Sequence, residues 1–310
     1  MLKADTADLP VVDISAFARA ANERARITSA VRQALEETGF LYVRGLGLAP
    51  ERVAAAFAAA RGFFGRPASD KAAYSYTDVA ANFGYQGIEV EKLDPGNAPD
   101  LKESFTMRNA LGENVLARRW PDESFRRAAL GLYEGSLAAA YRLLEVLAAG
   151  LSLPAQFFVQ RHRGENVTLR FLHYPANLPV RSETQLGAGA HTDYGSITLL
   201  FQDEVGGLEV RGVDGRWRYA PPIEDYAIIN TGDLMEHWTN GRFRSTLHRV
   251  RPVSGARDRY SIALFVDPDA AVDVECIRSC VTQDRPARYP RVTAGEHIRR
   301  KIAATHETAP

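Results

Sequence analysis

The tripeptide His191-Thr192-Asp193 is the part of the sequence with the clearest potential for chemistry. In an extended chain, residues two apart project to the same face, so the imidazole and the carboxylate can reach one metal ion. Two histidines and one carboxylate on one face of an octahedral ion leave open positions, a set that suits Fe(II) and oxygen chemistry. The tripeptide predicts two of these three ligands.

A third ligand must come from a distant part of the chain. The other histidines are His162, His173, His237, His248, His297 and His306. His248 stands in the extended run Thr246–Val250, which is followed shortly by Arg259-Tyr260-Ser261. Arg259 and Ser261 are again two residues apart, and a guanidinium together with a hydroxyl binds a carboxylate well. This pair predicts a carboxylate site near the metal.

The second half of the chain has the pattern of a β structure that could position these residues. Short apolar runs separated by turn residues predict strands at Val167–Tyr174, Ser196–Phe201, Leu208–Val210, Trp217–Tyr219, Ala227–Asn230, Thr246–Val250 and Tyr260–Val266. Gly206-Gly207 and Asp214-Gly215 predict hairpin turns. Strands at this spacing are typical of an antiparallel sandwich or jelly roll.

The first half of the chain predicts mainly helices. We expect strands at Leu9–Ile14 and Phe40–Val43, helices at Asn22–Glu37, Pro50–Phe64 and Phe125–Leu151, and a long irregular segment at Tyr74–Pro99. Thr38-Gly39 ends the first helix. Beyond Pro290 we expect an exposed helix. The predicted fold is α+β in one structural unit, with an N-terminal region 1–154 packed around a β core 155–275 and a C-terminal segment 276–310.

Composition limits the classes of partner. The 310 residues carry 38 Lys plus Arg and 38 Asp plus Glu, so there is no basic excess for binding nucleic acid. No window approaches the roughly 20 apolar residues that span a bilayer, and Met1–Asp5 does not open an apolar leader. Cys276 and Cys280 are too few for a disulfide framework. We expect a cytoplasmic protein that binds a small molecule, and the oligomeric state stays open.

An ordered series of segments resembles one enzyme family. The series is Leu9–Asp13, Thr38–Val43, Lys102–Phe105, Leu169–Pro175, Ala190–Gly195, Ile229–Asp233, Ser245–Val250 and Arg259–Ala263. Together these segments cover most of the chain from about residue 9 to 268, in the order of the family. They resemble the isopenicillin N synthase-like branch of the iron(II)/2-oxoglutarate-dependent dioxygenases.

The resemblance implies a ligand set and a reaction. By this match His191, Asp193 and His248 hold Fe(II), while Arg259 and Ser261, with Tyr174, bind the distal carboxylate of 2-oxoglutarate. The family fold is a double-stranded β-helix, or jelly roll. The implied reaction oxidises a small molecule with O₂, by hydroxylation or desaturation, and releases succinate and CO₂, with ascorbate as an optional reductant.

One position departs from the family pattern and keeps rival functions open. Plant members often carry Asn two positions before the tyrosine, where this chain has Leu172. Isopenicillin N synthase uses the Arg-x-Ser pair for a substrate carboxylate, and aminocyclopropane carboxylate oxidases keep the pair without 2-oxoglutarate. The alternatives are therefore a 2-oxoglutarate-independent iron oxidase and a non-catalytic binding or sensing protein. A zinc hydrolase is disfavoured because no general base or oxyanion hole is evident.

Other residues carry weaker expectations. Candidates to line the substrate pocket are Tyr85, Gln86, Glu103, Phe105, Phe201 and Phe265, each of which could equally be ordinary packing. His237 is a poor alternative ligand, and His173 is expected to face away from Tyr174 as a structural histidine. Asn230 fits a buried polar group near the metal as well as it fits a strand end.

Overall fold

A computed structural model gives the structure of residue 6 and residues 8–306, except 77–81, 95, 113–117, 177, 183 and 254. Part of the predicted irregular segment Tyr74–Pro99 therefore lies outside the described residues. The helices are α1 Ala21–Glu37, α2 Pro50–Phe64, α3 Ala68–Ala72, α4 Glu123–Gly150, α5 Gln156–Val159, α6 Asp233–Trp238 and α7 Ala294–His306, with a 3₁₀ turn at Arg278–Cys280. No helix in this part of the chain is long and apolar enough to cross a membrane.

The strands form two main sheets. They are β1 Val11–Asp13, β2 Phe40–Arg44, β3 Phe83–Gln86, β4 Glu103–Arg108, β5 Val167–Tyr174, β6 Ala188–His191, β7 Ile197–Gln202, β8 Leu208–Arg211, β9 Trp217–Tyr219, β10 Ala227–Thr231, β11 His248–Val250, β12 Arg259–Val266, β13 Asp273–Val274 and β14 Val292–Thr293. The large sheet has the order β1-β2-β10-β7-β12-β5-β4-β3, and the small sheet has the order β6-β11-β8-β9. β13 pairs separately with β14.

Local sequence signals explain where the main helices begin and end. The side chain of Asp122 accepts a hydrogen bond from the backbone N–H of Phe125 at 2.8 Å and so caps α4. α2 begins with Pro50, whose fixed φ suits the first turn. Gly39 has a φ of +72° just beyond α1, and a side chain there would lie 2.4 Å from the carbonyl oxygen of Arg244. Only glycine fits this position without strain.

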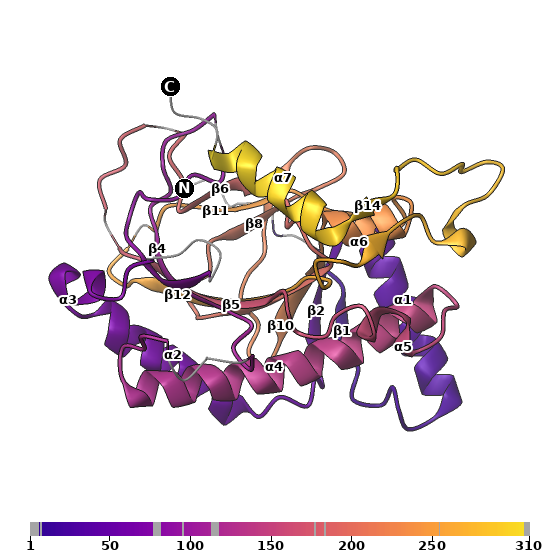
Figure 1. The fold of residues 1–310 in the computed structure, drawn as a ribbon, viewed down its shortest axis with the longest axis horizontal. Coiled ribbons are helices and arrows are strands. Elements are labelled where there is room, and N and C mark those ends of the chain that lie inside the picture. Colours follow the sequence, from indigo (N-terminus) through magenta and orange to yellow (C-terminus); the bar gives the residue numbers. More distant parts are fainter. Residues whose placement is uncertain are drawn as a thin grey trace.

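The large sheet has two different faces, because successive side chains of a strand point to opposite sides. One face packs against α1, α2 and α4 and forms the main apolar core. Figure 1 shows α4 running along this side, with the small sheet on the other. The opposite face lies against β6, β8 and β11 across a second apolar cluster, and we call it the metal-facing side. This is the jelly-roll core that the sequence predicted.

Several details differ from the predictions. Each strand run predicted between Val167 and Val266 is present, although β11 is shorter than its predicted run. β4 and β6 were not predicted, and β3 lies inside the segment expected to be irregular. Gly206-Gly207 is not a hairpin turn, because the chain there passes from β7 in the large sheet to β8 in the small sheet. Asp214-Gly215 does lie in the β8–β9 hairpin.

The N-terminal region contributes to the same sheet as the core. β1 to β4 precede residue 154, and β2 and β4 pair with β10 and β5 respectively. The predicted divisions at residues 154 and 275 stay a prediction. The helix expected beyond Pro290 is α7, and Cys276 and Cys280 are free thiols.

Candidate metal centre

Two strands of the small sheet bring the three predicted ligands together. His191 ends β6, His248 begins β11, and the two residues lie directly opposite each other in the antiparallel pair. Asp193 follows two residues after His191, beyond the end of the strand. One donor atom from each of the three side chains lies within 4.8 Å of the others. Within the described residues, these three side chains form a cluster of histidine and carboxylate groups that could hold a metal ion.

Hydrogen bonds fix which nitrogen of each imidazole faces the centre. Nδ1 of His191 lies 2.8 Å from the carbonyl oxygen of Gly189, and Nδ1 of His248 lies 3.1 Å from that of Thr246. A carbonyl accepts only from a protonated nitrogen, so Nε2 of each ring keeps its lone pair. The two Nε2 atoms lie 3.8 and 3.6 Å from Oδ1 of Asp193. The three atoms thus converge as a metal-binding set requires.

The second oxygen of Asp193 is held by neighbouring strands. Oδ2 accepts hydrogen bonds from the hydroxyl of Thr198 on β7 and from Nδ2 of Asn230 on β10, the latter at 2.7 Å. Asn230 is therefore both a residue near the end of its strand and a buried polar group beside the centre. Thr198 was not singled out from the sequence, since a threonine within a strand carries no distinguishing signal.

Electrostatics favour the metal-binding protonation states of His191 and Asp193. Burial and the neighbouring His248 lower the pKa of His191 to about 4. Burial raises the pKa of Asp193, but the two histidines and the hydrogen bonds from Thr198 and Asn230 outweigh burial, and the pKa is lowered. A neutral imidazole and an ionised carboxylate are the forms that bind a divalent metal.

A buried guanidinium lies deeper on the same side of the large sheet. Arg259 is 1% exposed, and its Nη atoms donate to Ser261 Oγ and Gln202 Oε1, both at 3.1 Å. Arg259 lies opposite Tyr174 in the β12–β5 pair, with its guanidinium carbon 4.5 Å from the ring centroid. Arg259 forms no ion pair with a carboxylate in the described part of the chain. Nε of Arg259 and Nε2 of Gln202 are buried without an acceptor there.

The charge and the free donors of this site fit an anion. A buried cation without a counter-ion is costly, and each buried donor without an acceptor adds to that cost. A carboxylate would satisfy both requirements. The site also lies near the proposed metal centre, because a Cβ added to Gly207 would lie 3.6 Å from Arg259 and 3.7 Å from Val250, which stands two residues beyond His248.

The structure does not bring four of the predicted pocket residues to the centre. Tyr85, Glu103, Phe105 and Phe201 lie on the helix-covered face of the large sheet. The ring of Phe63 on α2 packs on Tyr85 and Phe105, and Lys71 pairs with Glu103. The alternation of β4 and β7 turns these side chains away from the metal. Of the predicted set, Phe265 and Gln86 lie on the metal-facing side.

Two other histidines pack against aromatic rings away from the proposed metal centre. His173 faces the helices, where Nδ1 bonds to Glu103 at 2.7 Å and the ring stacks on Phe64 and Tyr260. His237 lies in α6 and stacks on Tyr289. Neither belongs to the group of converging donor atoms.

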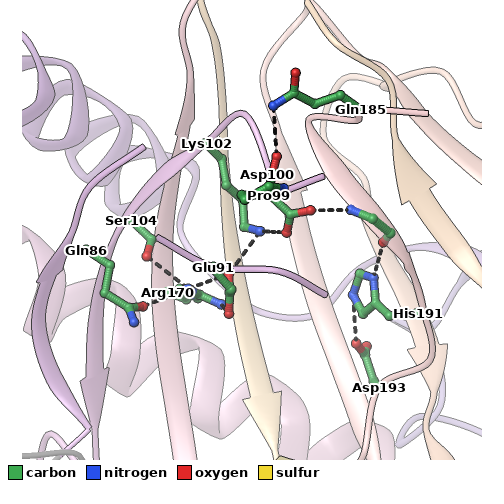
Figure 2. Close-up of polar contacts among 11 residues, drawn as sticks. Gln86, Glu91, Pro99, Asp100, Lys102, Ser104, Arg170, Gln185, His191 and Asp193 are labelled. Atoms are coloured by element: carbon green, nitrogen blue, oxygen red, sulfur yellow. Dashed lines mark hydrogen bonds and ion pairs between the residues drawn. The ribbon is translucent and has the colours of Figure 1, made fainter. Parts of the chain in front are cut away.

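A buried network of charges beside the metal was missed from the sequence. Figure 2 shows Arg170, Glu91, Lys102 and Asp100 linked by hydrogen bonds and ion pairs that lead to His191. Lys102 belongs to the segment Lys102–Phe105 that contributed to the resemblance. Nothing in the sequence indicated that Asp100 is buried and Glu91 partly buried, because both stand in a stretch rich in Pro, Gly and Asp.

Comparison with known proteins agrees with this geometry. Residues 155–268 match the model of the 2OG-Fe(II) oxygenase superfamily, and residues 9–123 match the N-terminal model of non-haem dioxygenases in morphine synthesis. A "2-oxoglutarate-Fe(II) type oxidoreductase" from Aspergillus fumigatus is 32% identical over 97% of this chain and 94% of its own length. The chain belongs to the 2OG-Fe(II) oxygenase superfamily.

Solved structures of similar proteins contain the cosubstrate. A full-length Neurospora crassa protein in complex with alpha-KG (2-oxoglutarate) superposes with a TM-score of 0.86 at 28% identity, over 98% of this chain and 100% of that one. The same protein with alpha-KG and thymine gives 0.85 at 29% identity, over 97% and 100%. This oxygenase is accordingly a 2-oxoglutarate-dependent dioxygenase that uses Fe(II) and O₂.

Proposed function

We propose that this oxygenase holds Fe(II) through Nε2 of His191, Nε2 of His248 and Oδ1 of Asp193. The observation that carries the assignment is the convergence of these atoms within 4.8 Å. The donor set supports iron, because two imidazoles and one carboxylate with open positions are the ligands of non-haem Fe(II) oxygenases. Oδ2 of Asp193 is occupied by Thr198 and Asn230, so the carboxylate binds through one oxygen.

We further propose that Arg259, Ser261 and Tyr174 bind the distal carboxylate of 2-oxoglutarate. The buried guanidinium supports this role, since it forms no ion pair among the described residues and its Nε lacks an acceptor there, and a carboxylate could supply both. Leu172 lies opposite Ser261 and adds an apolar wall to this site. When bound, Fe(II) and 2-oxoglutarate supply the activation of O₂, with release of succinate and CO₂.

The chain itself supplies orientation and an apolar surface. Leu172, Leu200, Ala263 and Phe265 belong to the apolar cluster on the metal-facing side of the large sheet. We propose that the substrate lies against this surface and is hydroxylated or desaturated there. The Neurospora crassa structure with thymine supports a substrate of small-molecule size. Two free thiols, of which Cys280 is buried, support a cytoplasmic location.

An anaerobic titration tests the two sites separately. The metal-free protein is titrated with Fe(II) and then with 2-oxoglutarate, and visible absorbance is followed. We expect a weak charge-transfer band that requires both additions, because it reports chelation of iron by the keto acid. In Arg259→Ala, half-saturation of the band should need about 10 to 100 times more 2-oxoglutarate, the range for losing hydrogen bonds to a charged group.

Arg257 provides a matched control. It lies two residues from Arg259, but its side chain is 68% exposed and pairs with Glu204 at the surface. Arg257→Ala should titrate like the unchanged protein. An equal effect of both substitutions would remove the assignment of Arg259, and a protein that binds no iron would remove the assignment of the metal ligands.

A further inference from the structure

The segment between β3 and β4 crosses the molecule beside the metal ligands. The described residues of the range 87–102 form no regular strand or helix, and we call this range the crossing segment. Its backbone joins the β6 side of the molecule at Leu101, whose N–H donates to the carbonyl of Leu186 at 2.9 Å. The segment ends in Asp100-Leu101-Lys102, and the side chains of Asp100 and Lys102 are 2% and 3% exposed.

Asp100 reaches the strand that carries His191. Its Oδ1 accepts a hydrogen bond from the backbone N–H of Gly189 at 2.9 Å. The carbonyl of the same glycine accepts the hydrogen bond from Nδ1 of His191 at 2.8 Å. Figure 2 shows a chain of contacts that leads from Asp100 to His191 and Asp193. Asp100 therefore holds the N–H of Gly189, and the carbonyl of the same glycine orients the imidazole of His191.

Gly189 needs such support because it must be a glycine. A side chain there would place its Cβ 2.8 Å from the backbone nitrogen of Asp94 in the crossing segment, which is too close. Glycine accommodates this approach, but its backbone is also the most permissive in φ and ψ. The direction of the Gly189 carbonyl, and hence of the His191 ring, is then fixed by contacts rather than by the residue itself.

A network of opposite charges holds Asp100 in place. Lys102 forms ion pairs with Asp100 and, at 2.9 Å, with Glu91. Arg170 on β5 donates to both carboxylate oxygens of Glu91 at 2.9 Å. Two positive and two negative groups balance, so the buried network needs no external ion. Such paired charges can fix a geometry even where they add little stability.

We propose that Asp100 is a positioning residue for the iron ligand His191, acting through the backbone of Gly189. This inference rests on the proposed metal ligation. It assigns to the crossing segment a role in setting the coordination geometry. Groups that hydrogen-bond to metal ligands commonly change metal affinity by about 10 to 100-fold in proteins. Asp100 bonds to Gly189 rather than to the ligand itself, so we expect the lower end of that range.

Cobalt(II) binding to the protein without 2-oxoglutarate tests the proposal. The visible d–d spectrum reports ligand geometry, and titration gives the affinity. We expect Asp100→Ala to shift the d–d bands and to weaken Co(II) binding about tenfold. Asp100→Asn keeps an oxygen that can accept from Gly189, so it should restore most of the affinity and the spectrum.

Glu103→Gln separates positioning from general stability. Glu103 is also 2% exposed and paired with a lysine, but it lies on the helix-covered face of β4. This variant should lower the melting temperature without changing the Co(II) spectrum. If Asp100→Ala lowers the melting temperature and leaves the spectrum unchanged, or if Asp100→Asn is no better than Asp100→Ala, the proposal is overturned.

A measurement on the unchanged protein covers the case in which Asp100→Ala does not fold. The Gly189 amide should exchange slowly with deuterium in the Zn(II)-loaded protein, because its hydrogen bond to Asp100 is buried. Rapid exchange would contradict the proposal. Failure of the unchanged protein to bind Co(II) would instead contradict the metal ligation itself, so the two failures are distinguishable.

Discussion

Nδ2 of Asn230 donates to Oδ2 of Asp193 at 2.7 Å, while Oδ1 of the same carboxylate faces the two imidazoles. One oxygen of the Asp193 carboxylate is thus held by the large sheet, and the other faces the two histidines of the small sheet. Because Thr198 donates to the same Oδ2, the rotation of the carboxylate is fixed before any metal binds. This arrangement connects the two layers of the jelly roll at the metal.

Removal of the Asn230 amide should weaken iron binding. In Asn230→Ala, Asp193 loses one of its two donors and can rotate, so we expect the Kd for Fe(II) to rise about tenfold. Competition with a chromogenic chelator under anaerobic conditions measures this change. Asn240→Ala is the control, since Asn240 is also fully buried but donates to the carbonyls of Cys280 and Pro286. Equal Kd values for Asn230→Ala and the unchanged protein would count against the role of Asn230.

The stability of the protein should fall in acid through His162. Burial lowers the pKa of this histidine from 6.5 to about 4, while its ring bonds to Phe158 and Ser196. The folded pKa lies below the unfolded value, so its contribution is complete above about pH 6.5 and is lost as the pH falls toward 4. Between pH 7.5 and 5 this amounts to about 2 kcal/mol of unfolding free energy.

Urea denaturation at these two pH values tests the effect. In His162→Gln the side chain no longer titrates, so the difference in unfolding free energy between pH 7.5 and 5 should shrink by about 2 kcal/mol. Other histidines with lowered pKa values, among them His237 and His297, keep the remaining pH dependence in both proteins. An unchanged difference would show that His162 does not contribute.

The buried pair Lys71–Glu103 should matter for stability but not for the metal. Lys71 Nζ lies 2.8 and 2.7 Å from the two carboxylate oxygens of Glu103. Lys71→Met leaves a buried carboxylate without its cation, which should cost about 3 kcal/mol of unfolding free energy. Lys71→Met combined with Glu103→Gln should recover part of the loss. Denaturant titrations measure both, and a change in Fe(II) affinity would show that this pair communicates with the centre.

Two glycines should respond to alanine in opposite ways. Gly39→Ala forces a side chain into a left-handed backbone and against the Arg244 carbonyl, and we expect a loss of about 2 kcal/mol or more. Gly62 lies inside α2, where no other atom lies within 4 Å of the place an alanine Cβ would take, so Gly62→Ala should gain about 0.5–1 kcal/mol. Thermal unfolding compares the two. A destabilised Gly62→Ala would mean that the α2 surface is not open.

Two of the proposed ligands were readable from the sequence because they depend on local spacing, whereas His248 was assigned through the family resemblance. His191 and Asp193 are two residues apart, as are Arg259 and Ser261, and such pairs share a direction in any extended chain. The partners of the ligands were not readable in the same way. Thr198 and Asn230 reach Asp193 only because β7 and β10 are adjacent in the large sheet, a pairing between strands that the local sequence does not determine.

The predicted pocket residues of β3 and β4 lie on the helix-covered face for a related reason. Both faces of β4 are buried, so its sequence Glu103–Arg108 shows no simple alternation of apolar and polar side chains. Glu103 and Phe105 share one face, and Ser104 and Thr106 share the other. Each pair contains a polar residue, so the sequence does not show which face meets the helices. Only the position of the helices identifies which face is which. The same uncertainty applied to Tyr85, whose partner in the β3–β4 pair is Phe105.

The opposite faces of β5 also limit how this protein can vary in length. Tyr174 and His173 are neighbours that serve different layers, one beside Arg259 and the other beside Glu103. Insertion or deletion of one residue within β5 would exchange them, placing an imidazole in the proposed cosubstrate site and a phenol among the helices. Natural variants of this chain are therefore expected to change the length of β5 by even numbers of residues, or to confine length changes to the loops that join the strands.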